Sequence, residues 1–204
     1  MTRRVVVVAL AVPAWTPPGI EPAAWRRALA DDAVDLLATL AEVTPALAVA
    51  RADRPLAEAG WPTMTVYELD PLTVAGVLGA AAADGYQQAA VLATDAPDLP
   101  GMVIAKLLRP LSSRPLAVAP VTGEPTGLLG IACRLPAPGW LPEIDLDTAT
   151  VAAVRAAAPA AGAVTATPGW HRLRTPRALH RLDPALYGAD ATRSVLAARG
   201  GGQG

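Results

Sequence analysis

Two kinds of apolar pattern alternate along the chain. Short continuous apolar runs are typical of strands buried on both faces, and they predict strands at residues 5–12, 46–50, 63–69, 88–94, 116–121, 127–133 and 162–167. Longer stretches with helical spacing or helix start signals predict helices at residues 23–43, 71–84, 101–108, 147–158 and 176–182. Because strands and helices alternate, the pattern predicts an α/β fold, a three-layer sandwich with a mostly parallel central sheet.

The first apolar run also has features of a signal peptide. Arg3 and Arg4 precede it, and small residues at 11–14 could form a cleavage site. The run is short for a signal peptide and opens with four valines, which favours a buried first strand. No stretch of the sequence approaches the ~20 apolar residues that span a bilayer. We therefore expect a cytoplasmic protein that does not associate with a membrane.

Composition narrows the class of protein. The 204 residues are 52% hydrophobic and 17% charged, which favours one packed domain, expected at residues 1–198, before a flexible Gly-rich tail at 199–204. A formal net charge of −1 disfavours a nucleic-acid partner. The single cysteine, Cys133, excludes an internal disulfide and a CxxC metal site.

The segment with the clearest chemical potential is residues 94–100, directly after a predicted buried strand. It holds Asp95 and Asp98 at the sheet edge where open α/β folds bind ligands. Carboxylates there can hold a Mg²⁺ ion that bridges to a nucleotide's phosphates. The structural alternative makes Asp98 the N-cap of the next helix and Asp95 a turn residue.

This segment, Thr-Asp-Ala-Pro-Asp-Leu-Pro, resembles the Ser-Asp-Ser-Pro-Asp-Leu-Pro motif of a bacterial family of glycosyltransferase-like proteins with the nucleotide-diphospho-sugar transferase (GT-A) fold. That family is similar to the molybdenum-cofactor and phospholactate guanylyltransferases. Weaker matches follow in the family's order, at residues 119–120, 128–130, 144–148, 168–170 and 175–176.

The resemblance implies a protein that binds a nucleotide or nucleotide-sugar with Mg²⁺ or Mn²⁺. It implies that Asp95 contacts the metal ion and that Asp95 and Asp98 are the catalytic carboxylates. It also implies substrate-binding roles for Gly19, Thr94 and Glu124.

The chain departs from the family at three of the four expected site segments. The first loop has Pro-Pro-Gly19 but lacks the family's Lys-Thr-Arg-Leu cluster, and the central Glu-Asp-Gly-Gly becomes Thr-Gly-Glu-Pro at 122–125. The late Asp-Val-Asp, implied to be a second metal contact, becomes Arg172-Leu-Arg174. Arginine can neutralise phosphate without a metal ion, so Arg172 and Arg174 are candidate substrate-binding residues. The alternative is a solvated basic surface.

Two functions stay open. The first is a nucleotidyl- or glycosyltransferase-like protein, which the surviving Asp95 and Asp98 favour. The second is a catalytically degenerate homologue that acts as a ligand-binding or protein-interaction module, which the lost loop cations favour. The strand ends predict that loops 13–22, 94–100 and 122–126 line one cleft.

Overall fold

The computed structural model describes residues 2–182 and 188–200. Its strands are β1 (Arg4–Ala9), β2 (Thr44–Ala50), β3 (Thr65–Leu69), β4 (Gln88–Ala93), β5 (Leu116–Pro120), β6 (Leu128–Arg134) and β7 (Val164–Ala166). They form one sheet in the order β3-β2-β1-β4-β6-β5-β7. Strand β6 runs antiparallel to β4 and β5, and the other pairs are parallel. The predicted mostly parallel central sheet is confirmed.

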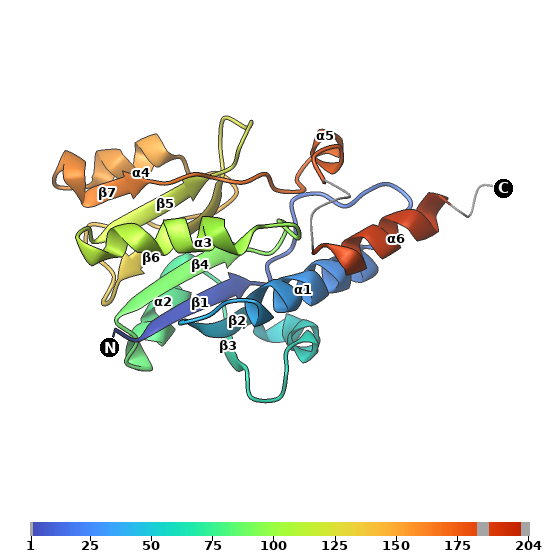
Figure 1. Ribbon diagram of the computed structural model, residues 1–204, viewed down its shortest axis with the longest axis horizontal. Coiled ribbons are helices and arrows are strands. Elements are labelled where there is room, and N and C mark those ends of the chain that lie inside the picture. The colour runs from blue at the N-terminus through green and yellow to red at the C-terminus, as the bar shows by residue number, and fades with distance from the viewer. Residues whose placement is uncertain (1, 183–187, 201–204) are drawn as a thin grey trace.

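Helices cover both faces of this sheet (Figure 1). They are α1 (Pro22–Ala38), α2 (Val74–Ala83), α3 (Gly101–Leu108), α4 (Val151–Ala157), α5 (Pro176–Leu179) and α6 (Asp190–Gly200), with 3₁₀ helices at Arg51–Ala59, Arg109–Ser112 and Ala161–Ala163. Helices α1 and α3 pack on one face, against residues such as Val6 and Val8. Helices α2 and α4 pack on the other, against Val5 and Val7. Successive side chains of a strand point to opposite faces, so this continuous run of valines serves both layers.

The predicted central strands form one buried sheet. Val7, Val91 and Val118 are all fully buried, as the sequence predicts. The first strand lies between β2 and β4 and ends at Ala9, so residues 10–12 belong to the following loop. Strands β1, β4 and β5 share one direction and therefore end at the same edge.

Two helices begin later than predicted because a threonine supplies the cap. Helix α2 starts after Thr73, whose hydroxyl accepts a hydrogen bond from Gly76 N, and not at residue 71. Helix α4 starts after Thr150, which caps Ala153 N, and not at residue 147. A hydroxyl that bonds an amide of the first turn defines where a helix begins.

Helix α6 is an element that the sequence pattern did not predict. It packs along α1 (Figure 1), and both carboxylate oxygens of Asp32 accept hydrogen bonds from its first turn, from Ala191 N at 2.9 Å and Thr192 N at 2.8 Å. Burial raises the pKa of Asp32, although these hydrogen bonds oppose the shift. Residues 199 and 200 of the expected tail lie in α6, and 201–204 lie outside the described residues. None of the described helices combines the length and apolar character that a bilayer span requires.

We expect Asp32→Ala to loosen α6, because two amides of its first turn lose their acceptor. The free energy of unfolding should fall by about 1 kcal/mol, the usual effect of losing a helix cap, and the amide protons of α6 should exchange faster. Asp35→Ala is the control, since Asp35 lies in α1 as Asp32 does, but on its exposed side. Equal exchange rates in the two variants would contradict this role of Asp32.

Candidate functional site

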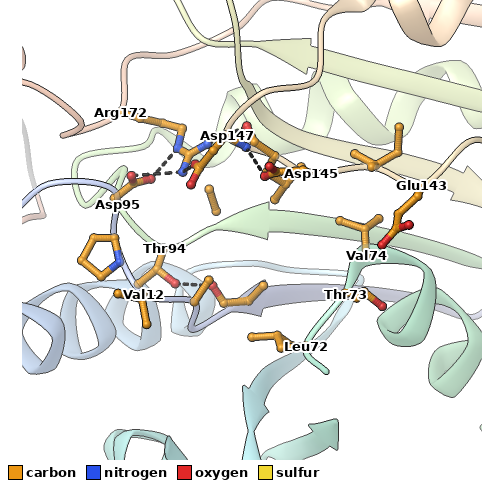
Figure 2. A pocket seen from close by; sticks show the side chains of 16 residues that line it. Val12, Leu72, Thr73, Val74, Thr94, Asp95, Glu143, Asp145, Asp147 and Arg172 are labelled. Carbon is orange, nitrogen blue, oxygen red and sulfur yellow. Dashed lines mark hydrogen bonds and ion pairs between the residues drawn. The ribbon is translucent and has the colours of Figure 1, made fainter. Parts of the chain in front are cut away.

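A cavity of about 200 Å³ lies beyond the carboxyl ends of β1 and β4. This is where open α/β sheets bind ligands. Its lining comes from the loop after β1, the start of α2, the loop after β4, the segment before α4, and Arg172. Figure 2 shows Asp95, Arg172 and Asp147 on one side of the cavity, and Val12, Thr94 and Leu72 on the opposite side.

A fully bonded arginine forms the charged side of this cavity. The Arg172 guanidinium donates from Nε and Nη2 to the two oxygens of Asp95, at 2.5 and 3.1 Å. Its Nη1 donates to the carbonyls of Leu128 and Leu146, at 3.0 and 2.9 Å, and Nη2 also donates to Asp147 Oδ1 at 2.6 Å. A guanidinium has five N–H donors, and here all five have protein acceptors.

Both partners of this ion pair are buried, so the charge of each depends on the other. Arg172 is 4% exposed and Asp95 is 2% exposed. Burial alone lowers the pKa of Arg172, but the neighbouring carboxylates of Asp95 and Asp147 outweigh it, and the net pKa is raised. The guanidinium therefore stays charged, and its charge is balanced inside the protein.

The backbone of residues 169–174 carries Arg172 across the ends of the strands. Val121 pairs with Trp170 in an isolated β-bridge, and Thr122 N donates to Trp170 O at 2.9 Å. Leu173 N donates to Asp95 O at 2.7 Å, and the Leu173 side chain is fully buried. These contacts attach the segment to β5 and to the loop after β4, which brings the guanidinium over Asp95.

Arg174 and Glu124 lie outside the cavity lining. Arg174 Nη1 is 3.3 Å from Glu124 Oε2 and donates to Thr126 O, and its Nη2 donates to Asp147 O at 2.8 Å. Arg181 donates to Thr122 O, in the same loop. The loop at residues 122–126 is thus tied to the C-terminal segment. The prediction that it shares one cleft with the other two loops is wrong for this cavity, which those two loops line through Pro13, Thr94 and Asp95.

Asp98 is separated from the cavity. Its side chain is fully buried, and Oδ1 accepts a hydrogen bond from Trp170 Nε1 at 3.0 Å. His171 Nε2 lies 3.1 Å from the same oxygen, without the alignment of a hydrogen bond. Helix α3 begins after Pro100 and has no side-chain cap, so the interpretation of Asp98 as its N-cap is wrong. The structure places Asp95 at the cavity and Asp98 beneath the segment that carries Arg172.

The two remaining candidates from the sequence occupy different places. Thr94 lines the cavity, and its hydroxyl donates to Ala9 O at 2.5 Å, which joins the ends of β1 and β4. Gly19 has a positive φ of 80° in the loop before α1, close to the side chain of Arg199, and is not among the lining residues.

Glu143, Asp145 and Asp147 line the cavity, although none is among the site residues expected from the sequence. The sequence allows Asp147 to assist a metal ion but favours it as the start of a helix, whereas its carboxylate binds Arg172. A signal was present, because an arginine at an expected acidic position needs acidic partners near it.

The donor set at Asp95 does not fit a divalent metal ion. Both oxygens of Asp95 already accept hydrogen bonds from Arg172. In residues 2–182 and 188–200, no group of three or more His, Cys, Asp or Glu side chains is arranged to hold a metal. The Mg²⁺ or Mn²⁺ that the resemblance implies therefore stays a prediction, and the contacts of Asp95 weigh against it.

Comparison with known protein structures identifies this fold. No protein-family profile and no curated protein sequence matches the chain. A candidate nucleotide-diphospho-sugar transferase from Desulfovibrio desulfuricans G20 matches in structure, with a TM-score of 0.67 and 17% identity over 98% of both chains. The fold is that of the nucleotide-diphospho-sugar transferases.

Two further structures share this fold. The 4-diphosphocytidyl-2C-methyl-D-erythritol synthase of Anaerococcus prevotii has a TM-score of 0.61 and 9% identity, over 95% of this chain and 96% of its own. A CMP:2-keto-3-deoxy-manno-octonic acid synthetase complexed with CTP has a TM-score of 0.58 and 13% identity, over 97% and 99%. Identities this low establish the fold and leave the activity of this chain to its own residues.

We expect Arg172→Met to lower the free energy of unfolding by about 3–5 kcal/mol, because it leaves the buried Asp95 carboxylate without a partner. Asp95→Asn in the same chain should restore part of this loss, because the uncompensated charge is then removed as well. Urea unfolding of the wild type, both single variants and the double variant measures the coupling energy. Additive losses would contradict a direct pair.

We expect any substitution of Gly169 that adds a side chain to destabilise the protein. A Cβ at this position would lie 1.9 Å from Pro120 O, whereas a Cβ at Gly139 has no neighbour within 4 Å. Gly169→Ala must displace residues 169–174, and we expect a loss of several kcal/mol, about as large as the strongest single-residue effects. Gly139→Ala should change the free energy of unfolding by less than about 1 kcal/mol. Similar urea midpoints for the two variants would contradict this expectation, because they would show that residues 169–174 can shift without cost.

Proposed function

We propose that this protein binds a small ligand at the carboxyl edge of the sheet without a divalent metal ion, and that it does not catalyse metal-dependent transfer. The observation that carries this proposal is the Arg172 guanidinium, whose five donors are all used beside Asp95. It supports the catalytically degenerate alternative, a ligand-binding module on a transferase fold.

The energetics of the Asp95 site support a metal-free site. A divalent ion at Asp95 would have to displace Arg172 from the carboxylate, and the displaced guanidinium would be buried with unpaired donors. Leaving a buried charge unpaired costs several kcal/mol. Phosphoryl transfer also depends on cations placed near the developing charge. Arg172 has no donor left for a phosphate, and it is the sole cationic side chain among the described residues of this lining.

A metal-dependent nucleotidyl- or glycosyltransferase is the second candidate. It is favoured by Asp95, which follows β4 and lines the cavity. The sequence resemblance to guanylyltransferases makes GTP the first nucleotide to test. The cytidylyltransferase names among the structural neighbours, one of them complexed with CTP, add CTP.

Thermal unfolding with GTP or CTP, in Mg²⁺, Mn²⁺ or EDTA, separates the two candidates. A nucleotide at a hundredfold excess over its Kd stabilises by about 2.7 kcal/mol, which raises Tm by roughly 5–10 °C for a domain of this size. The second candidate requires this shift, its loss in EDTA and its loss in Asp95→Asn. We expect no metal-dependent shift.

A variant at position 172 provides the matching positive test. Arg172→Asp removes the guanidinium and places a third carboxylate near Asp95 and Asp147. We expect this variant to bind Mn²⁺, as measured by electron paramagnetic resonance, and the wild type and Arg174→Asp not to bind it. Tight Mn²⁺ binding by the wild type that Asp95→Asn abolishes would overturn the metal-free proposal.

A further inference from the structure

We infer that the ligand of this cavity is a small organic cation, an amine, amidine or guanidine group on an apolar body. This inference rests on the proposed metal-free site and names the class of ligand that the site selects. It follows from three properties of the lining: all five donors of its arginine are bonded within the protein, its net formal charge is negative, and several of its other side chains are apolar.

Phosphate and carboxylate ligands lack an available cationic partner among the described residues of the lining. Arg172 is its cation, and all five donors of Arg172 have acceptors within the protein. Arg174 lies outside the lining and donates to the loop at residues 122–126 and to Asp147 O. An anion would therefore meet carboxylates without a free cation to compensate their charge.

Four carboxylates and one guanidinium line the cavity, which leaves a formal charge of −3. Asp95 and Asp147 share the guanidinium. Asp145 is exposed and accepts hydrogen bonds from Asp147 N and Thr148 Oγ1, both neutral donors, and Glu143 is also exposed. This surplus of negative charge attracts cations.

The distribution of these carboxylates favours an organic cation over a metal ion. Mg²⁺ and Ca²⁺ require six or more oxygens that converge on one point, and in the described part of the chain no three acidic or metal-binding side chains converge in this way. An ammonium or amidinium group needs one or two carboxylates, which Asp145 and Glu143 provide at the edge of the cavity.

Apolar side chains of the lining supply apolar contact. Val12 is 66% exposed, which is rare for valine in this structure, and it lines the cavity with Pro13, Leu72 and Val74. Covering apolar surface stabilises a complex by roughly 25 cal/mol per Å². The volume of about 200 Å³ is below the ~300–1,000 Å³ of pockets for drug-sized ligands, so the ligand is small.

Benzamidine, benzamide and benzoate test this inference, because they have one shape and carry positive, zero and negative charge. We expect chemical shift changes in ¹⁵N spectra of the wild-type protein to place benzamidine at Val12 and Asp145. Its Kd should be about tenfold lower than that of benzamide, should rise with salt, and benzoate should not bind. Equal affinity for the three probes, or binding of none, overturns the inference.

A double variant tests which charges select the cation. Glu143→Gln with Asp145→Asn removes two charges, while the amide oxygen introduced at position 145 can still accept the hydrogen bond from Asp147 N. We expect the preference for benzamidine over benzamide to fall severalfold. Glu58→Gln with Asp35→Asn is the matched control, because both residues are exposed and outside the lining. An unchanged preference in the first variant overturns the assignment. The Mn²⁺ titration tests the metal-free site separately, so either idea can fail alone.

Discussion

The ion pair between Arg172 and Asp95 is the interaction on which the carboxyl edge of the sheet depends. One buried guanidinium joins the loop after β4, the start of β6 at Leu128, and the segment before α4 at Leu146 and Asp147. These elements are far apart in sequence and meet at the carboxyl edge. A carboxylate as buried as Asp95 needs hydrogen-bond donors or a cation beside it, and here a cation that is covalently part of the chain supplies both.

This ion pair holds the carboxyl edge of the sheet together and also limits the chemistry that is possible there. A metal ion at such a place can keep open coordination positions for a ligand. A guanidinium whose five donors are satisfied has none, and it cannot turn toward a phosphate without breaking bonds to buried acceptors. The arginine whose donors are all bonded within the protein therefore has none to offer a phosphate, and in the proposed site selectivity comes from the exposed acidic residues and the apolar side chains of the lining.

The sheet was predictable from sequence because each central strand is a continuous apolar run that suits no exposed position. Helix α6 was not predictable, since it has few large apolar residues, Val195 and Leu196. The residue that caps it, Asp32, also lies about 160 positions earlier in the chain. The arginines were recognised as candidates, but charge and spacing do not reveal where donors point. The acceptors of Arg172 lie 25 to 77 positions away. Likewise, the spacing of Asp95 and Asp98 suggested a pair, whereas the turn after β4 sends one to the cavity and buries the other against Trp170.

Charge arithmetic explains how one fold can accept either kind of site. With an acidic residue at position 172, as the sequence resemblance implies for the related family, three carboxylates and a divalent ion would carry a formal charge of −1. Asp95, Asp147 and Arg172 carry the same charge. The substitution therefore leaves the electrostatic balance of the buried edge unchanged, while the guanidinium fills the space and bonds the carbonyls of Leu128 and Leu146. The formal charge of the buried edge therefore does not oppose such a change, and the proposed consequence is the loss of a metal site.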